Sequence, residues 1–477
     1  MKLRWSAALA LLLVFSMVLT ASADLYDRDE VDALMEETWQ QVIEAARQDP
    51  VRQEEITSVE VDVPCYDGSS LIYEKMEVCG ITDGEHTMMY TVSVIGQPDE
   101  NGQYPLYICL HGGGYDDDGT INNDQWFQMT SYYRDSVENG IYVAVRGITD
   151  EWDLHFDEAS YPLYDRLIED MIVFCDADPD RVYLLGFSAG GDGVYAVAPR
   201  MADRFAAVNM SSGHPNGVTL RNLSCLPICI QAGIRDTMFS PKRSVAAAAF
   251  DKVLDGYRET YGFGYTHKVY IHVPEGHNYN DHDPDTSSRQ LVLSDPQAFV
   301  DQMKKKSVSK LFPDSVSYNI DSKTNKQYKK IVQELGLKTK KSDTNAIRFV
   351  NKYTRDAHPE ALVWDLSVRA AKRETTSFYW LQADSAVDSG IICAAFDRET
   401  NTFYIELEQA PNGDFSILLN PLMVDFSRPV YVSYGDTTVE ADVRLDADAL
   451  AASMADTLDP DLSYAAKLSF GSLGFTD

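Results

Sequence analysis

Three residues of the sequence have the types and the order that nucleophilic catalysis requires, beginning with a serine. Gly186-Phe187-Ser188-Ala189-Gly190 follows the apolar, strand-like run RVYLLGF and precedes a helical pattern of apolar residues. A strand that turns sharply into a helix at a G-x-S-x-G sequence leaves the serine hydroxyl exposed at the turn. This context predicts that Ser188 is a nucleophile, and an ordinary glycine-rich turn is the alternative.

A serine nucleophile needs a base, because its hydroxyl hardly ionises at neutral pH. Asp236 follows the strand-like run LPICIQAG, and His277 follows the next such run, VYIHV. Both lie where strands end, which is where an imidazole and the carboxylate that orients it belong. We expect His277 to be the base and Asp236 its partner. His282 is the rival base. Glu275 or Asp281 could replace Asp236 only with unusual geometry.

Acyl transfer also needs hydrogen-bond donors aimed at the oxygen that becomes negatively charged. The turn His111-Gly112-Gly113-Gly114 directly follows the strand-like run YPLYICL, so its backbone can direct N–H groups toward a substrate carbonyl. We expect Gly113 to supply one donor, with Gly114 as the second choice. The Ala189 N–H is expected to supply the other. His111 itself is expected to be structural, because it precedes the glycine loop.

Other suggestive segments have plainer interpretations. The aromatic-rich segment 146–166 either lines the site or packs as an ordinary long loop, and the acidic run 116–118 is expected to be solvated. Asp residues alternate over 281–285 as in a calcium loop, but Thr286 stands where an EF-hand needs glycine. No spacing typical of zinc ligands is present. These patterns do not predict a metal site.

The elements that must position these residues are short apolar runs that alternate with helical patterns. Five of the runs are YPLYICL, IYVAV, RVYLLGF, LPICIQAG and VYIHV. Continuous apolar strands alternating with helices are typical of a mostly parallel sheet covered on both faces. We therefore expect an α/β fold. Before it, residues 24–50 are expected to form an amphipathic helix, and residues 55–63 and 87–95 are expected to form strands.

The composition changes after residue 302. Residues 303–341 contain eleven Lys and only three acidic residues, which we interpret as an inter-domain connection; a docking patch for an acidic polymer is the alternative. After about residue 358, short strand-like runs separated by turn residues suggest a small antiparallel β-sandwich. The predicted domains are a catalytic domain over 24–302 with an N-terminal extension, a Lys-rich linker over 303–345 and a β-rich domain over 346–477.

Aromatic residues alternate along the strands expected in the β-rich domain. They are Phe378, Tyr379, Trp380, Phe403 and Tyr404. Alternation fits a packed core better than an exposed platform for sugar rings, so we expect these side chains to form the core of that domain.

The first residues have the pattern of an export signal. Residues 1–23 begin with Lys2 and Arg4, continue with an apolar run and end in small residues, which predicts a secretory signal peptide; a retained membrane anchor is the alternative. The 477-residue sequence carries a formal charge of −33, which argues against nucleic acid and anionic membranes as partners. We expect a secreted protein that is soluble after cleavage of the signal.

Export permits disulfides, and the sequence contains seven Cys. Cys65 and Cys79 flank a turn between two strand-like runs, so they could face each other across a hairpin. Cys225 and Cys229 would be too far apart to bridge in an extended segment. The remaining cysteines lie in apolar runs and are expected to be small core residues.

Together, HGGG, GFSAGG, the aspartate of AGIRD and the histidine of EGH resemble the α/β-hydrolase superfamily. The pattern is most similar to secreted esterases of the polyhydroxybutyrate-depolymerase and feruloyl-esterase type, over about residues 85–300. The resemblance implies a mostly parallel eight-stranded sheet and a triad of Ser188, Asp236 and His277. It also implies that the chain needs no metal and no organic cofactor.

On this basis we expect a secreted serine hydrolase that cleaves carboxylic esters through an acyl-enzyme intermediate. A serine peptidase or amidase of the prolyl-oligopeptidase kind uses the same triad and is the alternative, although the β-propeller that such enzymes normally carry is not visible in the sequence. A non-catalytic binding protein of the same fold is a further alternative. The acyl and alcohol groups and the oligomeric state do not follow from these patterns.

Overall fold

The computed structural model describes residues 28–236, 242–282, 288–305, 332–333 and 336–475. The predicted signal peptide, most of the Lys-rich segment and positions 283–287 lie outside the described residues. Within the described residues, no helix is long and apolar enough to cross a bilayer.

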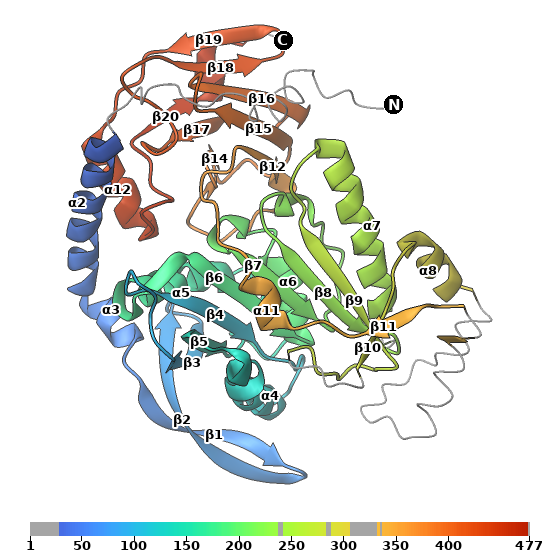
Figure 1. Ribbon diagram of the computed structural model, residues 1–477. Helices are drawn as coiled ribbons and strands as arrows, with labels where there is room; N and C mark the ends of the chain where they lie inside the picture. Colours follow the sequence, from blue (N-terminus) through green and yellow to red (C-terminus); the bar gives the residue numbers. More distant parts are fainter. Residues whose placement is uncertain (1–27, 237–241, 283–287, 306–331, 334–335, 476–477) are drawn as a thin grey trace.

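One mixed sheet of eleven strands forms the centre of the molecule (Figure 1), in the order β1-β2-β3-β5-β4-β6-β7-β8-β9-β10-β11. Strands β5, β4, β6, β7, β8 and β9 run parallel, and the outer strands pair antiparallel. The strands are β1 (Val59–Asp67), β2 (Ser70–Thr82), β3 (Thr87–Ile95), β4 (Tyr104–Leu110), β5 (Gly140–Val145), β6 (Ala177–Phe187), β7 (Ala207–Ser211), β8 (Ile228–Gly233), β9 (His267–Val273), β10 (Arg289–Leu291) and β11 (Thr339–Lys341).

This sheet is larger than the eight strands that the resemblance implies. At one edge the chain folds back at Gly68 and Ser69, so that β1 pairs with β2 along its whole length. At the other edge β10 pairs antiparallel with β9, and β11 pairs antiparallel with β10. An edge strand leaves a row of backbone donors and acceptors without partners, and additional strands satisfy them. The central parallel part is the α/β fold that the sequence predicts.

Strand β4 shows how the sheet is covered on both faces. Leu106, Ile108 and Leu110 pack in one cluster with α5 and α6, and Tyr107 and Cys109 pack in another with α4 and α11. Successive side chains of a strand point to opposite faces, so a continuous apolar run is buried on both sides. The helices are α4 (Thr120–Tyr132), α5 (Ser160–Cys175), α6 (Ala189–Val197), α7 (Arg243–Tyr261), α8 (Pro296–Met303) and α11 (Ala346–Val350).

The helix expected over 24–50 is present in the described residues, and a second, short helix follows it. The first, α2, is Arg28–Arg47, and the second, α3, is Pro50–Glu55. Asp49 precedes Pro50 and accepts a hydrogen bond from the Val51 N–H. Proline cannot continue a preceding helix but suits the first turn of a new one, which explains the break.

Helix α2 lies beside α12 (Ala447–Thr457), near the other end of the chain (Figure 1). Val31 and Met35 pack there with Leu450 and Met454 in one buried cluster. The N-terminal extension therefore contacts the C-terminal region as well as the large sheet.

The C-terminal region contains two small sheets, of five and four strands, in the orders β12-β15-β16-β18-β19 and β13-β14-β17-β20. Strands β16 and β18 pair parallel, so the region is not purely antiparallel as expected. The chain segment between β16 and β18 passes through the other sheet as β17, and the return crossover produces the parallel pair. The strands are β12 (Ala361–Asp365), β13 (Ser377–Phe378), β14 (Leu381–Ala383), β15 (Ile391–Asp397), β16 (Thr402–Gln409), β17 (Phe415–Leu419), β18 (Val430–Tyr434), β19 (Thr437–Ala441) and β20 (Ala466–Ser469).

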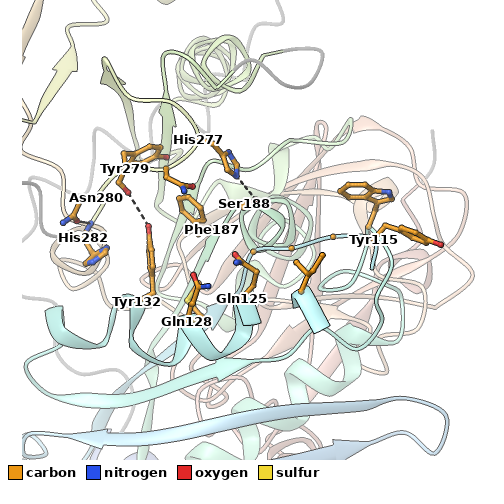
Figure 2. Close-up of a pocket in the computed structure, with 17 residues that line it drawn as sticks. Tyr115, Gln125, Gln128, Tyr132, Phe187, Ser188, His277, Tyr279, Asn280 and His282 are labelled. Atoms are coloured by element: carbon orange, nitrogen blue, oxygen red, sulfur yellow. Dashed lines mark hydrogen bonds between the residues drawn. The ribbon is translucent and has the colours of Figure 1, made fainter. Parts of the chain in front are cut away.

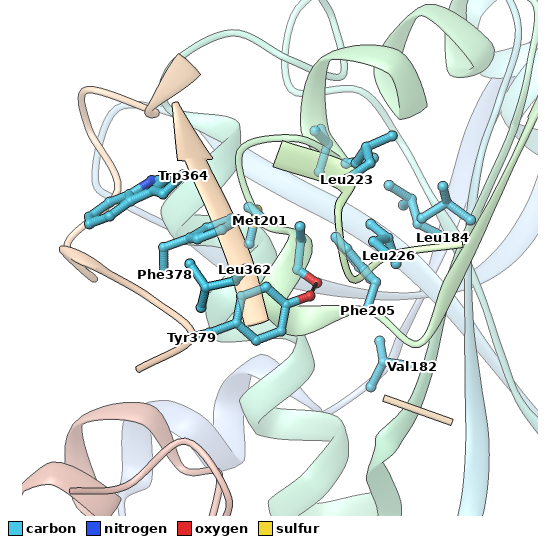
Figure 3. Close-up of a cluster of buried hydrophobic side chains, with 14 of the residues drawn as sticks. Val182, Leu184, Met201, Phe205, Leu223, Leu226, Leu362, Trp364, Phe378 and Tyr379 are labelled. Atoms are coloured by element: carbon cyan, nitrogen blue, oxygen red, sulfur yellow. Dashed lines mark hydrogen bonds between the residues drawn. The ribbon is translucent and has the colours of Figure 1, made fainter. Parts of the chain in front are cut away.

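The aromatic residues of this region are mostly core residues. Phe378, Tyr379, Trp380 and Phe403 are at most 2% exposed, and Tyr404 is partly buried. Figure 3 shows Phe378 and Tyr379 beside Met201 and Phe205 of the larger part of the molecule. The Tyr379 hydroxyl donates to the Ala202 carbonyl oxygen at 2.9 Å. The C-terminal sheets therefore share a core with the part of the molecule that contains the large sheet.

The chain also leaves the large sheet later than the predicted boundary at residue 346. Strand β11 pairs with β10, and Ile347 and Phe349 of α11 pack on the large sheet with Tyr107 and Tyr183. The apolar side of α11 covers sheet residues that would otherwise be exposed.

All seven cysteines are free thiols in the structure. The hairpin expected around residue 68 is present, but Cys65 lies opposite Ile72, and Cys79 pairs with Tyr90 of β3. The two-residue turn sets this register, which places Cys79 seven residues beyond the position that a cross-strand bridge to Cys65 would need.

Candidate active site

Ser188 occupies the turn between β6 and α6, where the sequence predicts it. The strand ends at Phe187, the helix begins at Ala189, and Ser188 has φ 59° and ψ −119°. A positive φ is costly for a residue that carries a Cβ, and such strain is concentrated at functional sites. The turn therefore presents the Ser188 hydroxyl at the carboxyl edge of the parallel strands.

A chain of hydrogen bonds leads from Ser188 to a buried carboxylate, and Figure 2 shows its first link, between Ser188 and His277. His277 Nε2 lies 2.8 Å from Ser188 Oγ, and His277 Nδ1 lies 2.7 Å from Asp236 Oδ2. A carboxylate oxygen only accepts, so Nδ1 carries the proton and Nε2 accepts from the Ser188 hydroxyl. Asp236 is 1% exposed and His277 is 7% exposed. The structure thus brings the three predicted residues together in the arrangement of a nucleophile, a base and an orienting carboxylate.

Parallel pairing of β8 and β9 explains why residues 41 positions apart meet. Strand β8 ends at Gly233, three residues before Asp236, and its neighbour β9 ends at Val273, four residues before His277. Both loops therefore leave the same edge of the sheet. Arg243, at the start of α7, donates from Nη1 to Asp236 Oδ1 at 2.9 Å. This hydrogen bond fixes the second carboxylate oxygen of Asp236. No local sequence pattern predicts the contact with Arg243.

His282, the rival base, lies in the same cavity but has a different partner. Its Nδ1 is 3.0 Å from Asp281 Oδ1, and Asp281 is completely buried. The hydroxyls of Tyr132 and Tyr133 donate to the Asp281 carboxylate at 3.1 and 3.0 Å. Asp281 is therefore committed to a separate buried cluster. The carboxylate at His277 Nδ1 is Asp236 rather than Asp281 or Glu275.

The glycine loop after β4 is held from one side by His111, which is completely buried. The Gly147 N–H donates to His111 Nε2 at 3.1 Å, so Nδ1 carries the proton, and it donates to the Gly112 carbonyl oxygen. Burial lowers the pKa of His111 well below its ordinary value, which keeps the ring neutral. A trans peptide points its N–H opposite to its carbonyl, so the Gly113 N–H points away from His111. His111 is therefore structural, as expected.

Of the three expected oxyanion donors, one N–H already donates to a side chain, and two N–H groups donate to no described residue. The Gly114 N–H donates to Asn122 Oδ1 at 3.0 Å, so Gly114 is not available to a substrate. The Gly113 and Ala189 N–H groups form no hydrogen bond with any residue that the structure describes. Ala189 is the first residue of α6, whose first N–H groups have no intrahelical partners and attract negative charge. A Cβ on Gly112 would lie 3.3 Å from Ser188 Cβ, so the loop adjoins the nucleophile.

Ser188 and His277 line a cavity of about 850 Å³ (Figure 2). Its walls are aromatic rings and neutral amides, and no Asp, Glu, Lys or Arg of the described residues lines it. Of the aromatic residues in segment 146–166, Trp152 lines the cavity and is 63% exposed, whereas Tyr161 and Tyr164 are buried in the core. Trp152 therefore lines the site, as one interpretation of the segment expects, and Tyr161 and Tyr164 are packing residues, as the other expects.

Helix α4 contributes a wall that the sequence did not predict. Gln125, Gln128 and Tyr132 line the cavity, at a spacing of three and four residues that places them on one side of a helix. That spacing is the signal that could have identified them. The acidic run 116–118 precedes this helix, and Asp117 and Asp118 are exposed, as expected, whereas Asp116 Oδ2 accepts hydrogen bonds from the Ile121 and Asn122 N–H groups at 2.7 and 3.2 Å.

No group of three or more His, Cys, Asp or Glu side chains among the described residues is arranged to hold a metal ion.

Comparisons with known proteins give structural matches alone. No family model and no curated protein matches this chain. A crystal structure of a thermostable esterase matches with a TM-score of 0.31 and 17% identity, over 44% of this chain and 62% of that one. A carboxylesterase from Mesorhizobium loti matches with a TM-score of 0.31 and 18% identity, over 43% and 93% of the two chains. A putative dipeptidyl aminopeptidase IV from Bacteroides ovatus matches with a TM-score of 0.30 and 17% identity, over 43% and 33%.

These matches cover less than half of this chain, and this chain spans about three fifths of the thermostable esterase. At such scores they do not establish a family.

Proposed function

We propose that this chain is a serine hydrolase that cleaves carboxylic esters through an acyl-enzyme intermediate. The observation that carries the proposal is the chain of hydrogen bonds from Ser188 through His277 to Asp236. It stands beside two backbone N–H groups that donate to no described residue. A hydroxyl with a base at 2.8 Å can be deprotonated as it attacks, which an isolated serine cannot achieve at neutral pH.

In the proposed reaction, His277 Nε2 takes the Ser188 proton while Oγ bonds to the ester carbonyl carbon. The carbonyl oxygen becomes an oxyanion and accepts hydrogen bonds from the Gly113 and Ala189 N–H groups. When the carbon–oxygen bond to the alcohol breaks, His277 returns the proton to the leaving oxygen. Asp236 stabilises the imidazolium throughout. Water then attacks the acyl group by the same steps, with His277 as base, and releases the acid and Ser188.

The described residues that line the cavity include no Asp or Glu, which supports an ester over an aminopeptide substrate. A peptidase that binds a free N-terminal ammonium group needs carboxylates near the nucleophile, because a buried cation must be paired. No Asp or Glu of the described residues lines this cavity. An uncharged ester has no such requirement. An amidase that acts on neutral amides is the remaining alternative, since it would use the same catalytic residues.

The test is hydrolysis of p-nitrophenyl esters from acetyl to octanoyl, and of methyl ferulate, by the purified protein. We expect turnover that falls at least about 10⁴-fold in both Ser188→Ala and His277→Ala. His282→Ala is the matched control, because it removes an imidazole from the same cavity without touching the Ser188 chain, and its kcat should stay within about tenfold of the parent.

Other outcomes separate the alternatives. Fluorophosphonate labelling of Ser188 without ester turnover, together with cleavage of a neutral chromogenic amide, would replace the esterase assignment by an amidase. Absence of labelling would mean a binding protein. A loss in His282→Ala as large as in His277→Ala would show that the base has been misassigned.

A further inference from the structure

Asn122 holds the glycine loop of the site from the side opposite His111. Its Oδ1 accepts from the Gly114 N–H at 3.0 Å, and its Nδ2 donates to the Gly114 carbonyl oxygen at 2.8 Å. Asn122 is completely buried in the first turn of α4. One amide side chain therefore binds both backbone groups of a single glycine.

A second contact fixes the orientation of the Asn122 amide. Nδ2 also donates to Asp150 Oδ1 at 2.8 Å, and Asp150 forms an ion pair with Arg146. A carboxylate cannot accept from an amide oxygen, so the NH₂ group must face Asp150, and Oδ1 must face the Gly114 N–H. The backbone of Asn122 is anchored as well, by the Asp116 carboxylate. Hydrogen bonds thus fix both the side chain and the backbone of Asn122.

The loop needs such an anchor because its backbone is unusual. Gly113 has φ 126° and Gly114 has φ 147°, conformations that other residues rarely adopt. Consecutive glycines also have the largest conformational freedom to lose. A Cβ on Gly113 would lie 2.1 Å from Asn122 Oδ1, so the amide packs directly on this glycine. His111 binds the peptide before Gly113, and Asn122 binds the peptide after it.

We propose that Asn122 is a positioning residue that holds the Gly113 N–H ready for the oxyanion. This inference rests on the proposed function. Asn122 is not one of the described residues that line the cavity, so it acts through the loop and not by touching the substrate. A donor that is fixed in advance stabilises the charge that develops in the transition state without reorganising. Loss of the anchor should therefore lower kcat more than it raises KM.

The experiment compares Asn122→Leu, which keeps the size but forms no hydrogen bonds, with Asn122→Ala, which removes the amide without adding apolar bulk. Ser131→Ala is the control on the same helix, because the exposed Ser131 hydroxyl donates to the Gln128 carbonyl oxygen and does not contact the glycine loop. We expect kcat of Asn122→Leu to fall about 10²–10³-fold with KM within about threefold. Asn122→Ala should lose a similar factor in kcat, and Ser131→Ala should be nearly unchanged.

A transition-state analogue provides a readout that a general structural role would not move. Binding of a trifluoromethyl ketone, which forms an oxyanion on Ser188, should weaken in Asn122→Leu by the same factor as kcat/KM falls. Binding of the product alcohol, which carries no negative oxygen, should not change. Equal weakening of both ligands, or a kcat within threefold of the parent in a variant with the parental melting temperature, would overturn the inference.

Two further measurements keep the test decisive. If Asn122→Leu does not fold, Asn122→Ala carries the comparison, and an unchanged kcat and analogue affinity there would overturn the inference. Failure of the proposed function is distinct, because the parent protein would then show no Ser188-dependent turnover. In that case the rate of fluorophosphonate labelling of Ser188 replaces kcat, and an equal rate in the parent and in Asn122→Leu would reject the role.

Discussion

Buried neutral histidines support the loop that carries the expected oxyanion donor. His155 Nε2 donates to the His111 carbonyl oxygen at 2.9 Å, and the two rings meet edge to face with centroids 4.6 Å apart. Burial lowers the pKa of His155 to about 3 and also lowers the pKa of His111. Both rings therefore stay neutral in the folded protein under conditions in which an exposed histidine is protonated.

This difference makes the contribution of His155 to stability depend on pH. In the unfolded chain the ring takes up a proton below about pH 6.5, whereas the folded state excludes it down to about pH 3. The unfolded state binds more protons between these values, so the contribution is fully present above about pH 6.5 and is lost as pH falls. In this window each pH unit changes the free energy of unfolding by about 1.4 kcal/mol for one such group.

We predict the effect from a comparison with His155→Gln, which can still donate to the His111 carbonyl but does not titrate. Subtracting the unfolding free energy of the variant from that of the parent cancels the titration of all other groups. This difference should fall by about 1.4 kcal/mol per unit as pH drops from 5.5 to 4.5. Urea unfolding at both values measures it. A difference that is constant with pH would show that His155 can be protonated in the folded state.

At the scale of elements, the site depends on how closely α6 approaches the sheet. A Cβ on Gly190 would lie 2.1 Å from the Leu110 carbonyl oxygen of β4, and a Cβ on Gly186 would lie 2.1 Å from the Gly190 carbonyl oxygen. Both are far shorter than any real contact of a Cβ with backbone, and backbone atoms cannot move aside cheaply. The glycines of the GFSAG sequence are therefore required by the packing of β4, β6 and α6.

We predict that Gly190→Ala lowers esterase activity at least about 10²-fold and destabilises the protein by about 1–3 kcal/mol, because α6 must move away from β4. Gly256→Ala is the control, since a Cβ there in the middle of α7 meets nothing within 4 Å. That substitution should stabilise the protein by up to about 1 kcal/mol. Melting temperatures and p-nitrophenyl ester kinetics test both, and normal activity in Gly190→Ala would contradict the packing argument.

In the whole molecule, ion pairs as well as apolar contacts join the C-terminal region to the large sheet layer. Arg373 donates from Nε and Nη2 to both oxygens of Asp165 in α5, at 2.6 and 3.0 Å, and lies 3.3 Å from Asp203. Elsewhere the buried Asp459 of the C-terminal region pairs with the buried Arg204 at 3.3 Å. A charge buried in this way destabilises the folded protein when its oppositely charged partner is removed.

We predict that Arg373→Met lowers the free energy of unfolding by about 3–5 kcal/mol, because it leaves Asp165 and Asp203 buried with one fewer cation. The neighbouring Lys372 is exposed, so Lys372→Met should change stability by less than about 0.5 kcal/mol. Urea unfolding followed by far-UV circular dichroism measures both. A loss below 1 kcal/mol in Arg373→Met would mean that the ion pairs contribute little to holding the two parts together.

The order and placement of Ser188, Asp236 and His277 follow from the sequence alone, because each comes directly after a continuous apolar run. Such runs become neighbouring parallel strands, and parallel strands end at the same edge of a sheet. Local periodicity is also enough to predict the hairpin around Gly68 and the structural role of His111. These features depend on residues close in sequence, which is where patterns are informative.

Tertiary structure alone decided which of the candidates meet. His277 and His282 are equivalent in type and nearly in position, and their partners, Asp236 and Asp281, were settled by the packing of loops on the sheet. Gly113 and Gly114 are identical in sequence terms, yet Asn122 occupies the N–H of one of them. The added strands β10 and β11 and the shared core with the C-terminal sheets likewise depend on contacts between distant segments. Hydrogen-bond partners are chosen by proximity in space, and no pattern along the chain encodes that proximity.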